Sequence, residues 1–268
     1  MYHAVVSSCI SFIEGIITYE NEIISDAIET TKQCLSLCNK FRRKNSVGET
    51  LGKLIGRNNY DLYSVIEIHA ELCYAESLLL NAMLSFLEDE TFASFIKGGL
   101  KVQTCYSIYK ECNNILIQRH WGDESHKKHF ESGVRLGLGV FNIMISSLPP
   151  RVIKLLEFIG FSGDKQCGLN TLKAGYMISS SFHEAACALA LLGFHLGMEC
   201  TFCHEETDLT FCDDILKASL KLYPQGMLFL YLNGRAELIK GNIEEAITYF
   251  TKSWKSQDQC KKFHDISF

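Results

Sequence analysis

Only three prolines occur in this chain of 268 residues, and they are Pro149, Pro150 and Pro224. The first 148 residues therefore contain none. Proline interrupts helices and marks turns, and chains built from many short strands usually need more of it. This distribution predicts long helices and argues against a β-sandwich or a β-barrel.

The overall composition is that of a globular protein with a mildly acidic charge. Hydrophobic residues make up 47% of the chain and charged residues 21%, which argues against a disordered chain. The formal net charge is −5. A chain with this charge has no overall electrostatic attraction for nucleic acid, so we expect no nucleic-acid partner.

Twelve cysteines are spread along the chain, mostly among apolar neighbours. In short secreted proteins held together by disulfides, the cysteines are dense in a short, loop-rich chain, which is not the case here. Residues 1–19 also lack the positively charged start of a signal peptide. We therefore expect thiols that fill a core in a cytoplasmic protein, with an organelle surface as an alternative location. The apolar stretches 133–148 and 185–198 are shorter than the ~20 residues that cross a bilayer. We expect no transmembrane segment and leave peripheral membrane contact open.

Apolar residues recur with a helical period along most of the chain, which predicts an all-α fold built from antiparallel helix pairs. Polar or glycine-containing linkers separate the periodic segments. We expect helices over residues 2–18, 21–45, 60–88, 91–117, 125–148, 151–159, 166–180, 182–198, 210–223, 225–240 and 243–255.

The clearest repeat signal lies in the last sixty residues and follows the 34-residue tetratricopeptide pattern. With Met227 as position 1, the small and turn residues of the pattern fall at Gly234, Gly241 and Ala246, and its late aromatic at Phe250. The departures are Asn233 for the usual leucine at position 7 and Glu237 for the usual tyrosine at position 11.

One such helix pair cannot bury its own apolar face, so a tetratricopeptide-like α-solenoid is implied. We expect a single helical-repeat domain over residues 1–268. Within it, an irregular helical region spans 1–199 and tetratricopeptide-like helix pairs span 200–268.

Several segments resemble the tetratricopeptide repeat protein 39 family, which is related to the inclusion-body clearance proteins of fungi. The matching stretches are 69–76, 94–101, 108–112, 130–134, 148–164 and 223–246. The resemblance implies a helical-repeat scaffold without a known active site, linked to protein turnover, lipid handling or aggregate clearance. Family members are about twice as long, so it also implies a chain truncated at both ends.

Our leading hypothesis is a non-enzymatic scaffold whose helical-repeat groove binds a protein or peptide. In the repeat register, Tyr231 and Arg235 fall on the inner helix and are the candidate peptide-binding residues. We expect no cofactor. The sequence contains neither a Gly-x-Ser-x-Gly elbow nor a Gly-x-x-x-x-Gly-Lys-Ser/Thr loop.

Two alternatives stay open. The glycine-rich apolar stretch 133–161 could enclose a lipid or cofactor in a central cavity. Cys200 and Cys203 have the spacing of a zinc-binding pair, and His204 and Cys212 could complete the site. Because the chain has no second pair at this spacing, we expect thiols without a metal there.

Overall fold

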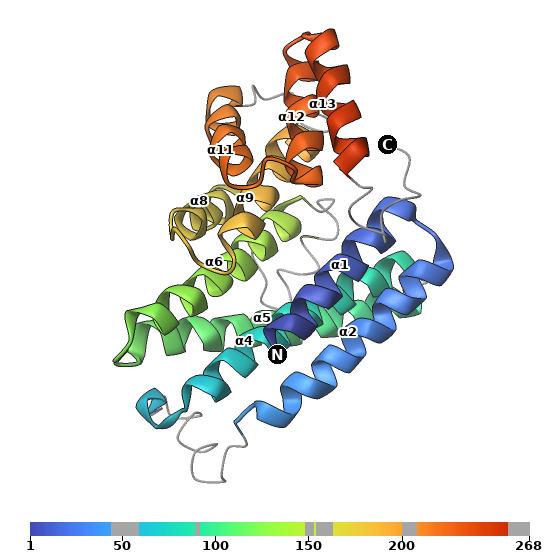
Figure 1. Cartoon of the computed structure of the whole chain (residues 1–268). Helices are drawn as coiled ribbons and strands as arrows, with labels where there is room; N and C mark the ends of the chain where they lie inside the picture. Colours follow the sequence, from blue (N-terminus) through green and yellow to red (C-terminus); the bar gives the residue numbers. More distant parts are fainter. Residues whose placement is uncertain (44–58, 89–91, 148–152, 154–162, 200–207, 257–268) are drawn as a thin grey trace. The chain divides into compact units, whose positions relative to one another are not determined.

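A computed structural model of the chain describes residues 1–43, 59–88, 92–147, 153, 163–199 and 208–256. These residues fall into two compact units, Met1–Phe141 and Asn142–Phe268. Every regular element in the described ranges is a helix (Figure 1). The all-α fold is therefore confirmed. The helix expected at 151–159 lies outside the described residues, apart from Ile153.

The first unit is a stack of long helices. α1, α2 and α4 pack against one another, and α5 packs on α4 (Figure 1). In the part of the chain that is described, no helix combines the length and the hydropathy of a bilayer-crossing segment. The elements are α1 (Tyr2–Thr18), α2 (Asn21–Phe41), the short 3-10 helix η1 (Tyr60–Leu62), α4 (Val65–Glu88), α5 (Phe92–Gln118) and most of α6 (Glu124–Ser146).

Thiols occupy the place where α1, α2 and α4 meet. Cys34 and Cys38 of α2 and Cys73 of α4 pack against Val5 of α1, and all four side chains are buried. The hydroxyl of Ser77 donates to the sulfur of Cys34 at 3.1 Å. A thiol is small and nearly apolar, so it lets three helices approach closely without an unsatisfied polar group. Seven of the nine described cysteines are buried, as expected for core residues.

Helix α4 begins with a reciprocal pair of side-chain caps. The backbone N–H of Ser64 donates to Glu67 Oε2 at 2.7 Å, and the backbone N–H of Glu67 donates to Ser64 Oγ at 3.2 Å. This capping box satisfies two N–H groups that the helix itself leaves without partners. One turn later, Arg42 from the end of α2 donates to both carboxylate oxygens of Glu71 at 2.7 Å. The cap and the ion pair together fix the start of α4 against the end of α2.

Glycine at position 137 lets α6 approach α5. A Cβ atom there would overlap the ring of Tyr109, a side chain that is buried. Nearby, the rings of Tyr106 and Phe141 stack with centroids 4.5 Å apart. Aromatic rings thus fill the space beside this glycine. The stretch 133–161, considered above as the wall of a lipid or cofactor cavity, is described only as far as residue 147 and at Ile153.

The second unit consists of shorter helices. Two of them begin with an aspartate cap: Asp164 Oδ1 accepts from the backbone N–H of Cys167, and Asp208 Oδ1 accepts from that of Phe211. α12 packs against α13 on one side and against α11 on the other (Figure 1). The elements are α8 (Lys165–Tyr176), α9 (Glu184–Gly193), η2 (Phe194–Glu199), α11 (Leu209–Leu222), α12 (Met227–Ile239) and α13 (Ile243–Ser256).

The single α-helix expected over 182–198 is wrong in its last five residues. The α-helix ends at Gly193, and the chain continues through η2 as a π-helix. Gly193 and Gly197 weaken α-helical geometry because glycine has the largest backbone freedom to lose. A donor from another helix stabilises this segment, since Arg235 Nη2 donates to the carbonyl oxygen of Leu196 at 2.8 Å.

α12 and α13 form the helical hairpin that the tetratricopeptide pattern predicted. A Cβ atom on Gly234 would lie 2.7 Å from two ring carbons of Phe250, so the two helices cross closely at this point. Ala246 is 1% exposed on the facing side of α13. Gly241 makes the turn with φ +85°, a left-handed conformation that favours glycine. The small residues of the repeat pattern therefore have the packing roles that the sequence indicated.

We expect Gly234→Ala to lower the free energy of unfolding by about 1–3 kcal/mol, because its methyl group needs the space of the Phe250 ring. Gly193→Ala is the matched control, since a Cβ there meets no atom within 4 Å. The control should be neutral or stabilising by up to about 1 kcal/mol, from the better helix propensity of alanine. Urea unfolding would measure both. A Gly234→Ala chain as stable as the control would contradict the close crossing.

Candidate functional site

Tyr231 and Arg235, the predicted peptide-binding residues, lie one turn apart on the same side of α12, and both are half-buried. The ring centroids of Tyr231 and Phe250 are 5.6 Å apart. Arg235 reaches the Leu196 carbonyl in η2. Arg235 therefore has a structural role in the second unit. Contact of either residue with a ligand stays a prediction.

A cavity of about 320 Å³ opens on another side of α12, between α11, α12 and α13 of the second unit. Its volume is at the lower end of the range for ligand pockets. It is lined by Asp213, Leu216, Lys217, Leu220, Asn233, Glu237, Lys240 and Tyr249.

Two departures from the repeat pattern in the sequence mark the position of this cavity. Asn233 and Glu237 stand where tetratricopeptide repeats usually carry leucine and tyrosine. Those two large side chains normally pack between neighbouring helices. A shorter amide and a carboxylate stand there instead, and both line the hollow.

Lys240 joins two walls of the cavity. Its Nζ lies 2.7 and 2.8 Å from the two carboxylate oxygens of Asp213 on α11 and 2.8 Å from Glu237 Oε1 on α12. Burial opposes the charge on Lys240, but the bonds to Asp213 and Glu237 prevail and raise the pKa of the ammonium. Bonds donated by Lys240 and then Asn242 lower the pKa of Glu237. Lys240 and Glu237 are therefore charged near neutral pH.

Lys217 stands apart from this arrangement. It is exposed at the rim of the cavity, close to the apolar side chains of Leu216 and Leu220. Within the described residues it has no ion-pair partner. The cavity thus presents an apolar wall beside an available cation, which suits a ligand with an apolar group next to an acidic one.

The candidate zinc site is only partly visible. Cys200, Cys203 and His204 lie outside the described residues. Cys212 is fully buried on α11. Among the residues that are described, no three His, Cys, Asp or Glu side chains are grouped so that they could hold a metal ion.

A second cluster of titratable groups lies inside the first unit. The hydroxyl of Tyr2 is 2.5 Å from Nδ1 of His69, a buried side chain. Burial and then the nearby Glu76 carboxylate raise the pKa of Tyr2 and raise that of Cys9 to about 12. Burial alone raises the pKa of Cys105 to about 12. Since the thiolate is the reactive form of cysteine, a raised pKa lowers the reactivity of Cys9 and Cys105 at neutral pH.

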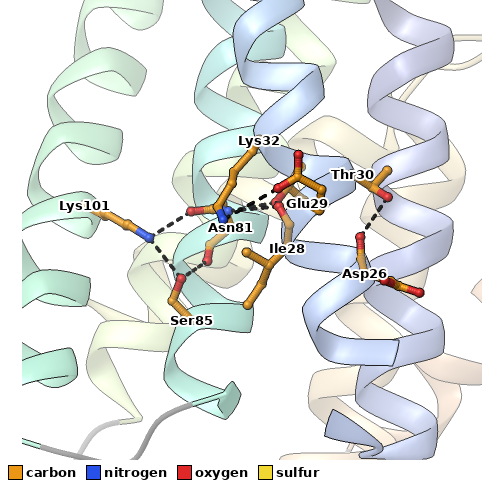
Figure 2. A network of polar contacts seen from close by, with 9 residues as sticks. Asp26, Ile28, Glu29, Thr30, Lys32, Asn81, Ser85 and Lys101 are labelled. Atoms are coloured by element: carbon orange, nitrogen blue, oxygen red, sulfur yellow. Dashed lines mark hydrogen bonds and ion pairs between the residues drawn. The ribbon is translucent and has the colours of Figure 1, made fainter. Parts of the chain in front are cut away.

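A polar seam runs across α2, α4 and α5 of the same unit (Figure 2). Asn81 of α4 is 2% exposed; its Nδ2 donates to Thr31 Oγ1 at 2.8 Å and its Oδ1 accepts from Lys101 Nζ at 2.9 Å. Lys101 Nζ also lies 3.0 Å from Ser85 Oγ. Burial, followed by repulsion from Lys32, lowers the pKa of Lys101. The seam satisfies polar groups inside the helix stack.

We expect Asn81→Ala to lower the free energy of unfolding by about 2–3 kcal/mol, because it leaves Thr31 and Lys101 with lost partners in a buried place. The variant that combines Asn81→Leu, Thr31→Val and Lys101→Met should recover most of that loss, since it removes the amide, the hydroxyl and the ammonium together, while Ser85 keeps its bond to the backbone carbonyl of residue 81. Urea unfolding would compare them. Equal losses in the single and triple variants would show that the seam is not the cause.

The acid sensitivity of the second unit should depend on Glu237. Its pKa in the folded state is below the ordinary value of 4.5, so its stabilising effect is full above that pH and disappears as the pH falls through the folded-state pKa. Glu237→Gln should therefore cost about 0.5–1 kcal/mol at pH 7 and less at pH 3. Thermal unfolding at both values would measure the difference. In a Lys240→Met background the cost should become small at both pH values, and a persistent cost would refute this origin.

The chain is similar in sequence to known proteins. Residues 1–268 match the sequence model of the Iml2/Tetratricopeptide repeat protein 39 family. A Caenorhabditis elegans protein described as "Tetratricopeptide repeat protein ttc-39B" is 38% identical over 269 residues, which cover 98% of this chain and 46% of that relative. The chain thus spans about half the length of the relative. No solved structure matches the chain.

The family match covers the whole chain and agrees with the helical hairpin of α12 and α13, and it confirms the resemblance noted in the sequence. Helical repeats of this type generally act as non-catalytic scaffolds for other proteins. This chain belongs to the Iml2/Tetratricopeptide repeat protein 39 family.

Proposed function

We propose that the chain is a non-enzymatic interaction scaffold and that it binds a protein segment in the cavity between α11, α12 and α13. The proposal rests on this cavity, which is lined by Asn233 and Glu237. These two residues stand at repeat positions that usually carry larger packing residues. Family membership supports the general role as a scaffold. In the same proposal the chain works as one helical-repeat domain, with an irregular region at 1–199 and repeat pairs at 200–268.

The lining of the cavity indicates the chemistry of the bound segment. Leu220 and Tyr249 supply apolar surface, and Lys217 supplies a cation without an ion-pair partner in the described ranges. The carboxylates of Asp213 and Glu237 are already engaged by Lys240. The segment that fits best carries an apolar side chain next to an acidic one.

Tyr231 and Arg235 form the alternative contact surface. At 3.6 residues per turn they lie on the side of α12 opposite Asn233 and Glu237. A short segment in the cavity therefore cannot contact Tyr231 and Arg235 at the same time. Substitutions on the two sides distinguish the two surfaces.

The finer role implied by the family is part of the same proposal. We propose that the bound partner belongs to the machinery of protein turnover, lipid handling or aggregate clearance, and that the encounter takes place in the cytoplasm or at an organelle surface. The support for this step is family membership alone. The identity of proteins that co-purify with the chain, with and without a blocked cavity, would test it.

A selection of peptides from a random display library against the purified chain would test the binding site. We expect enriched peptides that place Asp or Glu beside a large apolar residue. Asn233→Phe, which fills the cavity, and Lys217→Glu, which reverses its free cation, should each weaken a selected peptide at least about 10-fold, or roughly 1.4 kcal/mol. Fluorescence anisotropy would measure the dissociation constants.

Tyr231→Ala is the matched control on the opposite side of α12 and should change the dissociation constant less than about 2-fold. Circular dichroism would check that each variant keeps its helical content. Strong weakening by Tyr231→Ala together with no effect of Asn233→Phe would move the site to the Tyr231 side. Failure to enrich any peptide would contradict peptide binding by this chain.

A further inference from the structure

The amino group of Lys101 on α5 is held by uncharged acceptors (Figure 2). Its Nζ donates to Asn81 Oδ1 at 2.9 Å and to Ser85 Oγ at 3.0 Å. Among the described residues it forms no ion pair. Lys101 is half-buried, so a charge on its nitrogen loses part of its hydration. An anion in contact would offset that loss, and the two neutral oxygens offset it only in part.

Both acceptors are themselves fixed in place. The hydroxyl of Ser85 donates to the backbone carbonyl of Asn81 at 2.7 Å, so its oxygen can only accept from Lys101. Nδ2 of Asn81 donates to Thr31, which turns Oδ1 toward Lys101. Two N–H groups of Nζ are therefore engaged in either protonation state. The remaining position carries the third proton of the ammonium or, in the neutral amine, the lone pair. The seam thus orients the lone pair of this nitrogen.

The charges around Lys101 favour the neutral amine. Burial and then repulsion from Lys32 on α2 lower its pKa, and the attraction of Glu88 on α4 opposes them more weakly. Lys32 is itself exposed and lies 3.7 Å from Glu29. Desolvation and a neighbouring cation are the two means by which proteins make a lysine nucleophilic near neutral pH.

We propose that Lys101 is a modification site, at which its amine takes the acyl group of an acyl thioester such as acetyl-coenzyme A. The lone pair of Nζ attacks the carbonyl carbon of the thioester, the C–N bond forms and the C–S bond breaks. The sulfur leaves as a thiolate and takes up the proton that the nitrogen releases. The products are a neutral amide and a free thiol, and no oxidant or reductant takes part.

Acylation would change the seam between α4 and α5. An acylated Nζ has no charge and keeps a single N–H group. This group cannot donate fully to both Asn81 Oδ1 and Ser85 Oγ, so one of the two loses its donor. The modification therefore loosens the packing of α5 on α4. This inference goes beyond the proposed scaffold function and concerns the first unit alone, whereas the peptide cavity lies in the second.

Competitive labelling would test the nucleophile. The native 268-residue chain is incubated with acetyl-coenzyme A at about pH 7.5, where most lysines are protonated. It is then unfolded, its remaining amines are acetylated with a heavy-isotope reagent, and mass spectrometry gives the light fraction at each lysine. We expect Lys101 to react at least about 3-fold faster than Lys217, an exposed lysine without an ion pair in the described residues.

Two substitutions on α2 test the cause of this reactivity. Lys32→Glu replaces the repelling cation with a carboxylate, so it should slow the acetylation of Lys101 at least about 3-fold. Lys40→Glu is the matched control, because it makes the same change of charge on an exposed residue about two turns further along α2. The control should leave the rate at Lys101 within about 1.5-fold of the original.

Acetyl-lysine placed at a single position during synthesis would test the effect on the fold. With acetyl-lysine at position 101, the midpoint of urea unfolding should fall by roughly 0.3–0.5 M, because an acceptor in the seam loses its donor. The same residue at position 217 is the matched control and should leave the midpoint unchanged, since Lys217 is exposed and lies in the second unit.

Each measurement has a result that would overturn the proposal. Acetylation of Lys101 at the rate of Lys217, or more slowly, would show that the seam does not activate its amine. Equal effects of Lys32→Glu and Lys40→Glu would remove the local field as the cause. An unchanged urea midpoint with acetyl-lysine at position 101 would refute the link to helix packing. Peptide binding in the cavity is measured separately, so the two proposals fail independently.

Discussion

Close approach between helices is the constraint on which both units depend. It is achieved wherever one helix offers a small side chain to a large one: Gly137 receives the ring of Tyr109, and Gly234 receives the ring of Phe250. Where α1, α2 and α4 meet, three small thiol side chains allow the helices to approach closely. Each contact gains packing energy only because its small partner is already in place, so these positions determine which helices can be neighbours.

The helix positions and the hairpin of α12 and α13 could be predicted from the sequence, because the apolar residues recur with a helical period. The helix positions follow from the spacing of apolar residues and from the absence of proline before Pro149. The hairpin of α12 and α13 follows from Gly234, Ala246 and Phe250 in tetratricopeptide register. The π-helix at 194–199 was missed, because its apolar pattern is that of an ordinary helix and the donor that supports it, Arg235, comes from 39 residues further along the chain.

The candidate site was harder to predict. Register alone put Tyr231 and Arg235 on the inner helix, but it did not indicate that Arg235 would bond to Leu196. The cavity exists because Asn233 and Glu237 stand where the repeat pattern has larger packing side chains. Such a departure from the pattern predicts a cavity only when the position of the neighbouring helix is also known. The ion pair of Lys240 with Glu237 has the local i,i+3 spacing, but the pair with Asp213 joins residues 27 apart on two helices, so no local spacing predicts it.

The seam of Thr31, Asn81 and Lys101 has a consequence for how the first unit assembles. Helices that meet only through Leu, Ile, Ala and Cys could slide along one another by a turn and lose little contact energy, because one apolar side chain can substitute for another. An amide that needs a hydroxyl on one neighbour and an ammonium on the other is satisfied at one alignment alone. We expect this seam to exclude misaligned stacks, so the aliphatic residues around it can vary in shape without loss of a unique fold.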